Sequence, residues 1–571
     1  MLAAVPAAQA VTLHGQVRHE AAGAPLLLDS LNYTTQAGEP FSVTRASCLL
    51  SGFSLQRGDG SWLDLPGHVV WLDAASRRTS FALPDVPAGH YVALRFHVGL
   101  DAATNAANPA QHAPDHALNP NVNGLHWSWQ GGYIFLALEG NWRGADGKPG
   151  GFSYHFARDP NRTAIILKDS FDLTGDATAD IRFDVVAALS GTSPLSMAKD
   201  GVSTHSQPGD PISAALAANL PAAFALKSVT SHVPTVAQPS EIKPIDLPAK
   251  FTPFPFKTGH NFPPPALPRD NPLTQERVAL GKRLFHDTAL SRDGTLSCAS
   301  CHPRKNAFAD PRQFSLGVEG RTSLRHSMPL FNLAWKTRFF WDGRATTLRQ
   351  QALVPIQDHL EMDEKLENVV AKLEKTTAAD FEKAFGTPEI TPQRIGLALE
   401  NFLLTLTSHD SKFDRAMRGE EKLTPEEQRG FELFMMEREP RMGSLGADCF
   451  HCHGGPLFTD HQFRNNGLPI DAKDLGRFQV TQSALDRGTF STPSLRNIAL
   501  TAPYMHDGRF KTLEEVLDHY SQGVQRTDTL DPNLAKHPDG GLHLNPKDKQ
   551  ALVAFLKTLT TKELEAVTEL P

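Results

Sequence analysis

Two short motifs combine thiols and an imidazole at the spacing that covalent haem attachment requires. Residues 298–302 read Cys-Ala-Ser-Cys-His, and residues 449–453 read Cys-Phe-His-Cys-His. In Cys-x-x-Cys-His the two thiols add to the haem vinyl groups, and the histidine ligates the iron. We therefore predict two covalently bound haem c groups, held by Cys298, Cys301, His302, Cys449, Cys452 and His453.

A zinc or redox thiol site is the alternative interpretation of a Cys-x-x-Cys pair. Four of the five cysteines in the chain belong to the two motifs, and histidine directly follows both pairs. A zinc site would also need ligands from cysteines elsewhere. The repeated trailing histidine therefore favours haem.

A second group of candidate ligands lies in the N-terminal half, where histidines stand beside two tryptophans. Residues 125–133 read Leu-His-Trp-Ser-Trp-Gln-Gly-Gly-Tyr, and His97 and His155 lie in flanking predicted strands. Taken singly, each histidine is more often a hydrogen-bonded residue than a ligand. Together, His97, His126 and His155 could converge on copper, zinc, iron or nickel, since imidazole suits all four metals.

The chain is long enough to hold several domains around these groups, because 571 residues exceed the size of one hydrophobic core. From 11 to 226, apolar and polar residues alternate between Gly, Pro, Asn and Asp turns, which predicts an antiparallel β-domain resembling a sandwich. The predicted strands are 11–17, 48–55, 69–72, 91–98, 133–138 and 164–171.

Residues 227–262 are rich in proline and are predicted to form an interdomain linker, whose downstream half packs along the next domain as a strap. The part after the linker is predicted to be mainly helical, with one haem motif in each of two lobes, 263–420 and 421–571. The predicted helices are 274–285, 366–385, 391–406, 425–435, 513–520 and 545–559.

The ends and the composition restrict where the protein works. Residues 1–10, MLAAVPAAQA, resemble the end of a secretory signal, and haem c is normally attached outside the cytoplasm, so we expect a periplasmic or cell-surface location. The sequence contains no run of about 18 apolar residues, so it predicts no transmembrane helix. A net charge of −7 gives no electrostatic reason to expect nucleic acid as a partner.

The N-terminal half resembles the MbnP/CorA-type copper-binding proteins. The resemblance rests on 96–100, 125–140 and 150–156, and covers most of residues 11–226. It implies copper bound among His97, His126 and His155, next to Trp127 or Trp129 oxidised to kynurenine. The paired cysteines usual in that family are absent, since Cys48 is the one cysteine in this half.

The C-terminal half resembles the bacterial diheme cytochrome c peroxidase superfamily. Besides the haem motifs, the matching segments are 281–285, 340–345, 492–497 and 501–508. The resemblance implies two cytochrome c lobes, with Trp341 as an electron relay between the haems. It also implies that Glu361 is the distal acid/base of the first haem, with Gln351 beside it. A carboxylate so placed assists peroxide cleavage, typically by 10²- to 10⁴-fold.

Two positions point to one branch of that superfamily. Val318 stands where peroxidases usually have a distal histidine, so the first haem is expected to be open. Tyr520 stands where the second haem usually has methionine, and a phenolate stabilises ferric and higher iron states. Both substitutions resemble the MauG/MbnH branch, whose members store two oxidising equivalents over both haems and oxidise side chains of a partner protein.

Calcium between the haems is a further property of the superfamily, bound by an Asn side chain and two main-chain carbonyls. Thr501 and Pro503 match the carbonyl positions, but His326 replaces the Asn. Imidazole is a poor ligand for a hard cation. We therefore interpret His326 as structural and keep calcium only as an open alternative.

The combined hypothesis is an enzyme fused to its substrate. Hydrogen peroxide would oxidise the haem sites, a tryptophan of the β-domain would become kynurenine, and copper would then bind there for periplasmic copper homeostasis. One alternative is a diheme peroxidase that reduces hydrogen peroxide with electrons from a small external redox donor. The other is a non-enzymatic copper-binding or electron-transfer protein.

Overall fold

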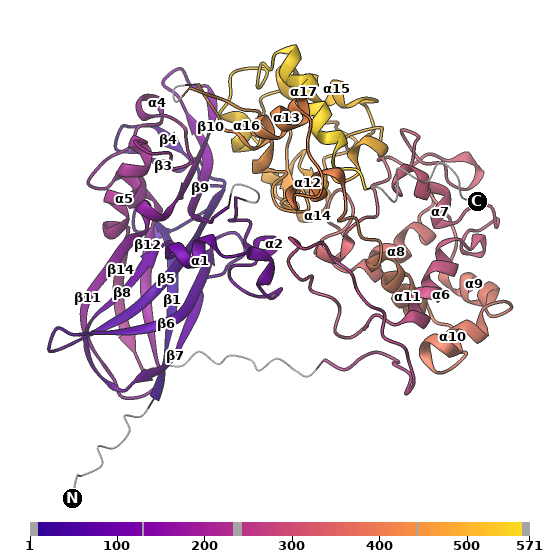
Figure 1. Cartoon of the computed structure of the whole chain (residues 1–571), viewed down its shortest axis with the longest axis horizontal. Helices are drawn as coiled ribbons and strands as arrows, with labels where there is room; N and C mark the ends of the chain where they lie inside the picture. The colour runs from indigo at the N-terminus through magenta and orange to yellow at the C-terminus, as the bar shows by residue number, and fades with distance from the viewer. Residues whose placement is uncertain (1–9, 128–130, 232–241, 441–442, 562–571) are drawn as a thin grey trace, which may run out of the picture. The chain divides into compact units, whose positions relative to one another are not determined.

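Figure 1 shows a computed structural model of the chain, in which two compact units are distinguished. The β unit comprises Met1–Pro239 together with Leu530–Pro538, and the helical unit comprises Ser240–Thr529 and Asp539–Pro571. Within the residues that the structure describes, no helix combines the length and the apolar composition that crossing a bilayer requires. The described residues are 10–127, 131–231, 242–440 and 443–561.

The β unit consists of two sheets with short helices at their ends. Its strands are β1 (Ala10–Ala21), β2 (Ala24–Pro25), β3 (Tyr33–Thr34), β4 (Pro40–Phe41), β5 (Arg45–Arg57), β6 (Trp62–Asp73), β7 (Ser80–Pro87), β8 (Gly89–Val98), β9 (Ile134–Arg143), β10 (Pro149–Ala157), β11 (Thr163–Leu173), β12 (Ala177–Asp184), β13 (Ser203–Thr204) and β14 (Phe224–Thr230). One sheet has the order β11-β8-β5-β9-β10-β13 and the other β14-β12-β1-β2, with β7 beside β1.

The β-rich fold predicted for this half is confirmed, with one difference in topology. Strand β1 alternates buried and partly exposed residues as a half-buried strand does, whereas β9 is buried continuously from Ile134 to Gly140. Two pairs, β1 with β12 and β10 with β13, are parallel and not antiparallel. Long connections join these strands, and a parallel pair requires such a crossover.

Apart from α5, the described helices of the β unit are short, and the last strand of this unit extends past the predicted boundary. Strand β14 continues to Thr230, four residues beyond the end predicted for the β-domain. The helices are α1 (Ala102–Ala106), α2 (Pro120–Asn123), α3 (Val185–Ser190), α4 (Met197–Asp200), α5 (Pro211–Ala223) and α16 (Pro532–Ala535).

The helical unit is mainly helical, as predicted, but two predicted helices end differently. The predicted helix 366–385 is two helices, because the chain turns at residues 374–377 before helix formation resumes. The predicted helix 513–520 leaves α-geometry after Asp518 and continues as the π-helix η12 (His519–Gly523). The α-helices are α6 (Gln275–Phe285), α7 (Cys298–Cys301), α8 (Leu348–Gln357), α9 (Leu366–Leu373), α10 (Ala378–Phe385), α11 (Pro392–Leu404), α12 (Lys412–Met417), α13 (Pro425–Met435), α14 (Phe478–Thr481), α15 (Leu513–Asp518) and α17 (Pro546–Lys557).

Two helix pairs in this unit repeat one packing arrangement. Helix α6 crosses α11 at Gly281, where an added Cβ would overlap the carbonyl oxygen of Ala398. Helix α13 crosses α17 in the same way at Gly430, against the carbonyl oxygen of Ala551. Both glycines begin a Gly-x-x-Leu-Phe sequence upstream of a haem motif. The two lobes thus share a local sequence and a helix crossing.

The downstream half of the proline-rich stretch and the residues that follow it pack along the helical unit, as the sequence predicts for the strap. Arg277, fully buried on α6, donates to the carbonyl oxygens of Ile245 and Asp246, both at 2.7 Å. The indole Nε1 of buried Trp335 donates to the carbonyl oxygen of Pro263 at 2.7 Å. These bonds satisfy two large buried donors with carbonyls that a proline-rich segment leaves unpaired.

Candidate functional site

The first haem motif forms one helical turn that orients its histidine. Residues Cys298–Cys301 make up α7, and the His302 N–H donates to the Cys298 carbonyl oxygen at 3.0 Å. The Nδ1 of His302 lies 2.7 Å from the Phe308 carbonyl oxygen, so it carries the proton and donates. The other ring nitrogen, Nε2, is then the acceptor that is available to a metal.

The second motif has the same arrangement. It begins as a 3₁₀ turn, η9 (Cys449–His451), and the His453 N–H donates to the Cys449 carbonyl oxygen at 2.9 Å. The Nδ1 of His453 donates to the carbonyl oxygen of Phe458 at 3.2 Å. In both motifs the residues therefore fit haem c, with two cysteines and an Nε2 ligand on one short turn.

The first motif faces a partly open, largely apolar cavity of about 70 Å³. Polar groups in its wall are few and include Gln351 of α8 and Glu361 on the turn after that helix. A second cavity shares His302, Gln351 and Glu361 with the first, and is also lined by Trp341. The predicted acid/base residue and its neighbour therefore face the proximal histidine of the first motif.

Glu361 holds its proton more strongly than an exposed glutamate. Burial of the carboxyl raises its pKa to about 7, the charge of Asp358 adds to this, and the charge of Arg344 opposes it. A carboxyl with a pKa near neutrality can both accept and return a proton at physiological pH. This is the electrostatic behaviour that a distal acid/base needs.

Val318 lies against Glu361 in the loop that also borders the cavity. The Val318 N–H donates to the Glu361 carbonyl oxygen at 2.8 Å, and the valine side chain is 1% exposed. Its neighbour Gly317 packs so closely on Leu360 that a Cβ would overlap the Leu360 carbonyl oxygen. Valine offers no atom that can ligate iron, so this loop supplies no imidazole at that position.

Trp341 is held by hydrogen bonds to residues from both lobes of the helical unit. Its indole Nε1 donates to the carbonyl oxygen of His326 at 2.8 Å, and its own carbonyl oxygen accepts from the Ser491 N–H at 2.7 Å. The next residue, Asp342, accepts from Arg325, which also pairs with Asp474. The indole is therefore held in one orientation between the two lobes.

Tyr520 lies in the π-helix η12, where the widened turn displaces it from α-helical geometry. The Asn466 amide nitrogen lies 3.5 Å from the Tyr520 hydroxyl and 3.4 Å from the Met505 sulfur. Asn466 therefore belongs to the environment of the Tyr520 hydroxyl. Sequence reasoning missed Asn466, whose only signal was a turn-like Asn-Asn-Gly.

His326, at the position of the calcium-binding Asn, is 4% exposed. The Nδ1 of this imidazole donates to the carbonyl oxygen of Gln313 at 3.3 Å. The backbone N–H of His326 donates to the carbonyl oxygen of His506 at 2.8 Å. Burial lowers the pKa of His326. A neutral imidazole does not supply the oxygen ligand that calcium prefers, so the donor set does not fit calcium. Thr501 and Pro503 would contribute only their carbonyl oxygens.

A second polar cluster lies inside the β unit, around His155 on β10. The His155 Nε2 lies 2.9 Å from the Glu139 carboxylate, and its Nδ1 lies 3.3 Å from the Nε2 of His205. The Trp127 ring is centred 4.8 Å from the His205 ring and 5.8 Å from the His155 ring. All four side chains are at most 8% exposed.

Strand pairing explains why these residues meet. Ser153 of β10 is opposite Glu139 of β9, so His155, two residues further, is on the same face as Glu139. Strand β13 runs parallel to β10 with Tyr154 opposite Thr204, which brings His205 next to His155. Sequence reasoning missed His205, because it follows a strand of only two residues.

The three histidines predicted to converge are not brought together as one set. His126 forms a β-bridge with Tyr133, and its ring packs on the Tyr133 ring at 4.6 Å. Adjacent residues of an extended segment point to opposite sides, so His126 and Trp127 diverge. His97 lies against Gly52 on β5 and interacts with the charge of Arg162. Trp129 lies outside the described residues.

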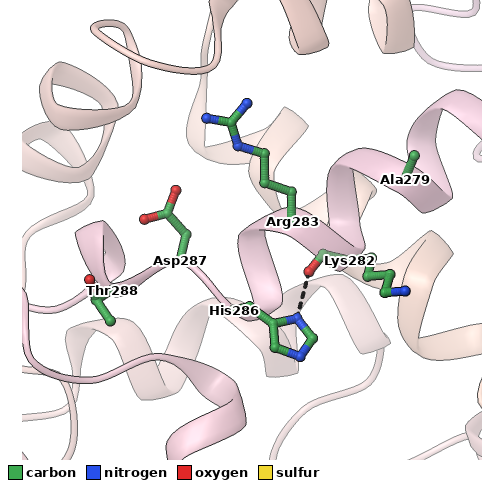
Figure 2. Close-up of a pocket in the computed structure, with 6 residues that line it drawn as sticks. All are labelled: Ala279, Lys282, Arg283, His286, Asp287 and Thr288. Carbon is green, nitrogen blue, oxygen red and sulfur yellow. Dashed lines mark hydrogen bonds between the residues drawn. The ribbon is translucent and has the colours of Figure 1, made fainter. Parts of the chain in front are cut away.

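A surface depression at the end of α6 lies apart from both haem motifs. Figure 2 shows its lining, where the His286 Nδ1 donates to the Lys282 carbonyl oxygen at 2.9 Å. None of its lining residues borders the two cavities at the first motif. We assign the depression no chemical role. Its lining residues are Ala279, Lys282, Arg283, His286, Asp287 and Thr288.

The paired Cys-x-x-Cys-His turns and the partly buried carboxyl of Glu361 beside the cavity define the class of the helical unit, a c-type diheme oxidoreductase. The family model for di-haem cytochrome c peroxidase matches residues 275–422, and the model for MbnP matches residues 9–206. The chain belongs to the MauG and di-haem cytochrome c peroxidase family, with an MbnP domain joined to its N-terminal side.

Two relatives found by sequence agree with this assignment, and one solved structure is similar to the chain. Methylamine utilization protein MauG from Methylophilus methylotrophus is 37% identical over 310 residues, which are 53% of this chain and 87% of that protein. Cytochrome c peroxidase Ccp from Escherichia coli (strain K12) is 36% identical over 309 residues, 52% of this chain and 61% of that protein. A crystal structure of a MauG-like protein associated with microbial copper homeostasis is 35% identical, covers 55% of this chain and 98% of its own, and has a TM-score of 0.49.

Proposed function

We propose that this protein is a peroxide-dependent diheme oxidase that converts Trp127 of its own β unit to kynurenine and so creates a copper site. The observation that carries the proposal is the position of the Trp127 ring, buried 4.8 Å from His205 and 5.8 Å from His155. Because an indole offers copper no good ligand, copper binding beside these two imidazoles would depend on a chemical change in Trp127.

The proposed oxidation balances with hydrogen peroxide as the only oxidant. The C2–C3 bond of the indole breaks and each carbon gains an oxygen atom, giving N-formylkynurenine. Two hydrogen peroxide molecules accept the four electrons and leave as two water molecules. Hydrolysis then releases formate and leaves kynurenine.

When bound, the two haems supply the iron at which peroxide is reduced and hold the oxidising equivalents. Glu361 takes a proton from the attacking peroxide oxygen and returns it to the departing oxygen, for which its pKa of about 7 is suited. Gln351 orients the peroxide in the same cavity, and Trp341 relays electrons between the lobes. Tyr520 would supply a phenol oxygen to the iron of the second haem.

Copper binding then follows from the changed donor set. An indole offers copper no good ligand, whereas kynurenine exposes an aniline nitrogen and a carbonyl oxygen beside His155 and His205. Imidazole is a common copper ligand. Glu139 accepts the Nε2 proton of His155 at 2.9 Å and so fixes the orientation of this ring. We further propose that the protein is exported and works in copper homeostasis of the periplasm.

A diheme peroxidase using an external donor is the second candidate function. It is favoured by the relatives named cytochrome c peroxidase, which are 31–36% identical to this chain. In that case peroxide would be consumed in proportion to an added electron donor, and Trp127 would stay intact.

Peptide mapping decides between the two candidates. Protein with both haems attached is treated with hydrogen peroxide, and the peptides containing Trp127 and Trp129 are analysed by mass spectrometry, alongside a His302→Ala variant. Conversion in the wild type only, followed by copper binding measured by titration, supports the proposal. Intact tryptophans in the wild type overturn it and leave the peroxidase.

The same experiment tests whether each chain oxidises itself. A tethered substrate needs no diffusional encounter, so the yield after a fixed time should not depend on protein concentration if the linker spans the distance. A yield that rises with concentration would instead show oxidation between chains.

A further inference from the structure

Lys336 of the helical unit is a lysine that the proposed chemistry does not use. It directly follows η7 (Leu333–Trp335), and its side chain borders the cavity that His302 and Trp341 also line. Burial lowers the pKa of Lys336 to about 8, and no acidic group opposes that shift. Among the described residues its ammonium group has no hydrogen-bond or ion-pair partner.

A second unused nitrogen group, His461, stands close enough for the two charges to interact. His461 lies in the segment after the second haem motif, where the Asp460 N–H donates to the Cys452 carbonyl oxygen at 2.8 Å. The Nε2 of His461 is shielded from solvent and has no partner among the described residues. Burial and the charge of Lys336 lower its pKa to about 4, against the opposing effect of Asp460.

Two desolvated nitrogen groups without an acceptor are costly in a folded protein. The Lys336 side chain is partly buried, so its ammonium loses part of the hydration of its charge without gaining a counter-ion, and the buried Nε2 of His461 lacks a hydrogen-bond partner among the described residues. Both costs are removed by one carboxylate, which pairs with the ammonium and accepts from the imidazole. Haem brings two such carboxylates, its propionates, into this unit.

We propose that Lys336 and His461 bind one haem propionate, with Lys336 as its counter-ion and His461 as a neutral N–H donor. Lys336 borders the cavity of the first motif, and His461 belongs to the segment of the second. The propionate therefore lies where the two lobes adjoin within the helical unit, near Trp341. This inference needs the haems but does not depend on the oxidation of Trp127.

The charge at Lys336 should set a haem reduction potential. An uncompensated propionate stabilises the ferric state, so Lys336→Met should lower the midpoint potential of one haem, measured by spectroelectrochemical titration. Lys336→Arg keeps the charge and should restore most of the potential. In resonance Raman spectra, the propionate bending band of one haem should shift in Lys336→Met and in His461→Leu.

The matched control is Lys305→Met, which removes the same charge from an exposed position three residues after His302. Solvent screens that charge, so the potentials should stay at wild-type values. All variants should retain both haems by pyridine haemochrome assay. Unchanged potentials and unchanged propionate bands in Lys336→Met, with both haems attached, would overturn the proposal.

A free small carboxylate could in principle occupy the same pair, and acetate serves as the probe. If the propionate is already bound, added acetate should change neither the potentials nor the Raman bands of the wild type. An acetate-dependent shift in the wild type that is lost in Lys336→Met would show a free-anion site and would overturn the propionate assignment.

Discussion

Glu361 combines partial burial with a nearby like charge, and both raise the pKa of its carboxyl. Glu361→Gln keeps size and hydrogen bonding but removes the base. We expect the reaction of the first haem with peroxide to slow by on the order of 10²-fold or more, with haem attachment unchanged. Stopped-flow absorption measures the rate. The exposed Glu367→Gln is the control and should react as fast as the wild type.

The pH dependence of the same reaction follows from the raised pKa of Glu361. The carboxylate, which is the active base, predominates above a pKa of about 7 and is lost as the pH falls below it. The peroxide rate should therefore rise through about pH 7 and level off above it. A rise that persists in Glu361→Gln would assign the titration to another group.

Val318 determines whether the first iron is open. Because valine cannot ligate, we expect the ferric protein to show one high-spin and one low-spin haem by electron paramagnetic resonance. Tyr520→Met should keep both haems attached and raise the potential of the second haem, since methionine favours the ferrous state. Two low-spin haems in the wild type would contradict this assignment.

The presence of His326 at the position of the calcium-binding Asn leads to a prediction about the removal of calcium. Its imidazole does not supply the oxygen ligand that calcium prefers, so treatment with EGTA should leave the spin states and the Tm unchanged. His326→Asn restores an amide oxygen and should make both properties respond to added calcium. Sensitivity of the wild type to EGTA would mean that other oxygen atoms bind the metal.

Among the elements, the two helix crossings explain how each haem motif is positioned. Gly281→Ala and Gly430→Ala place a methyl group against a backbone carbonyl that cannot rotate away. Each substitution should destabilise the protein by about 1–3 kcal/mol, as overpacking does. Denaturant unfolding of the haem-loaded protein measures the loss. Lys282→Ala, at the exposed position next to Gly281, should change stability little.

The elements also show how far the sequence predicts the structure. The sequence predicts both ends of α13 correctly. Its start is marked by the N-cap residue Thr424 and by Pro425 in the first turn. Local periodicity missed the turn between α9 and α10, where no glycine or proline marks the break. It also missed the parallel pairs of β1 and β10, since pairing partners far apart in the chain leave no local pattern.

For the whole molecule, a site built from one short motif can be predicted from the sequence more fully than a site that the fold assembles from distant segments. Haem c could be expected from the sequence, because the chemistry of its attachment fixes the spacing of two cysteines and a histidine within five residues. The Trp127 cluster could be predicted only in part, because it combines three separate segments of a sheet. His155 was found, whereas His205 came from pairing with a two-residue strand and His126 faces the other side of its own segment.

The repeated crossing at Gly281 and Gly430 has a consequence for biogenesis. In each lobe the two helices that cross are roughly 120 residues apart, and the haem motif lies between them in the chain. Contacts of such long sequence separation form late in folding. We therefore expect each pair of cysteines to stay accessible to haem and to the attachment machinery until the last helix of its lobe has formed. On this account, haem attachment comes before the closing of each lobe.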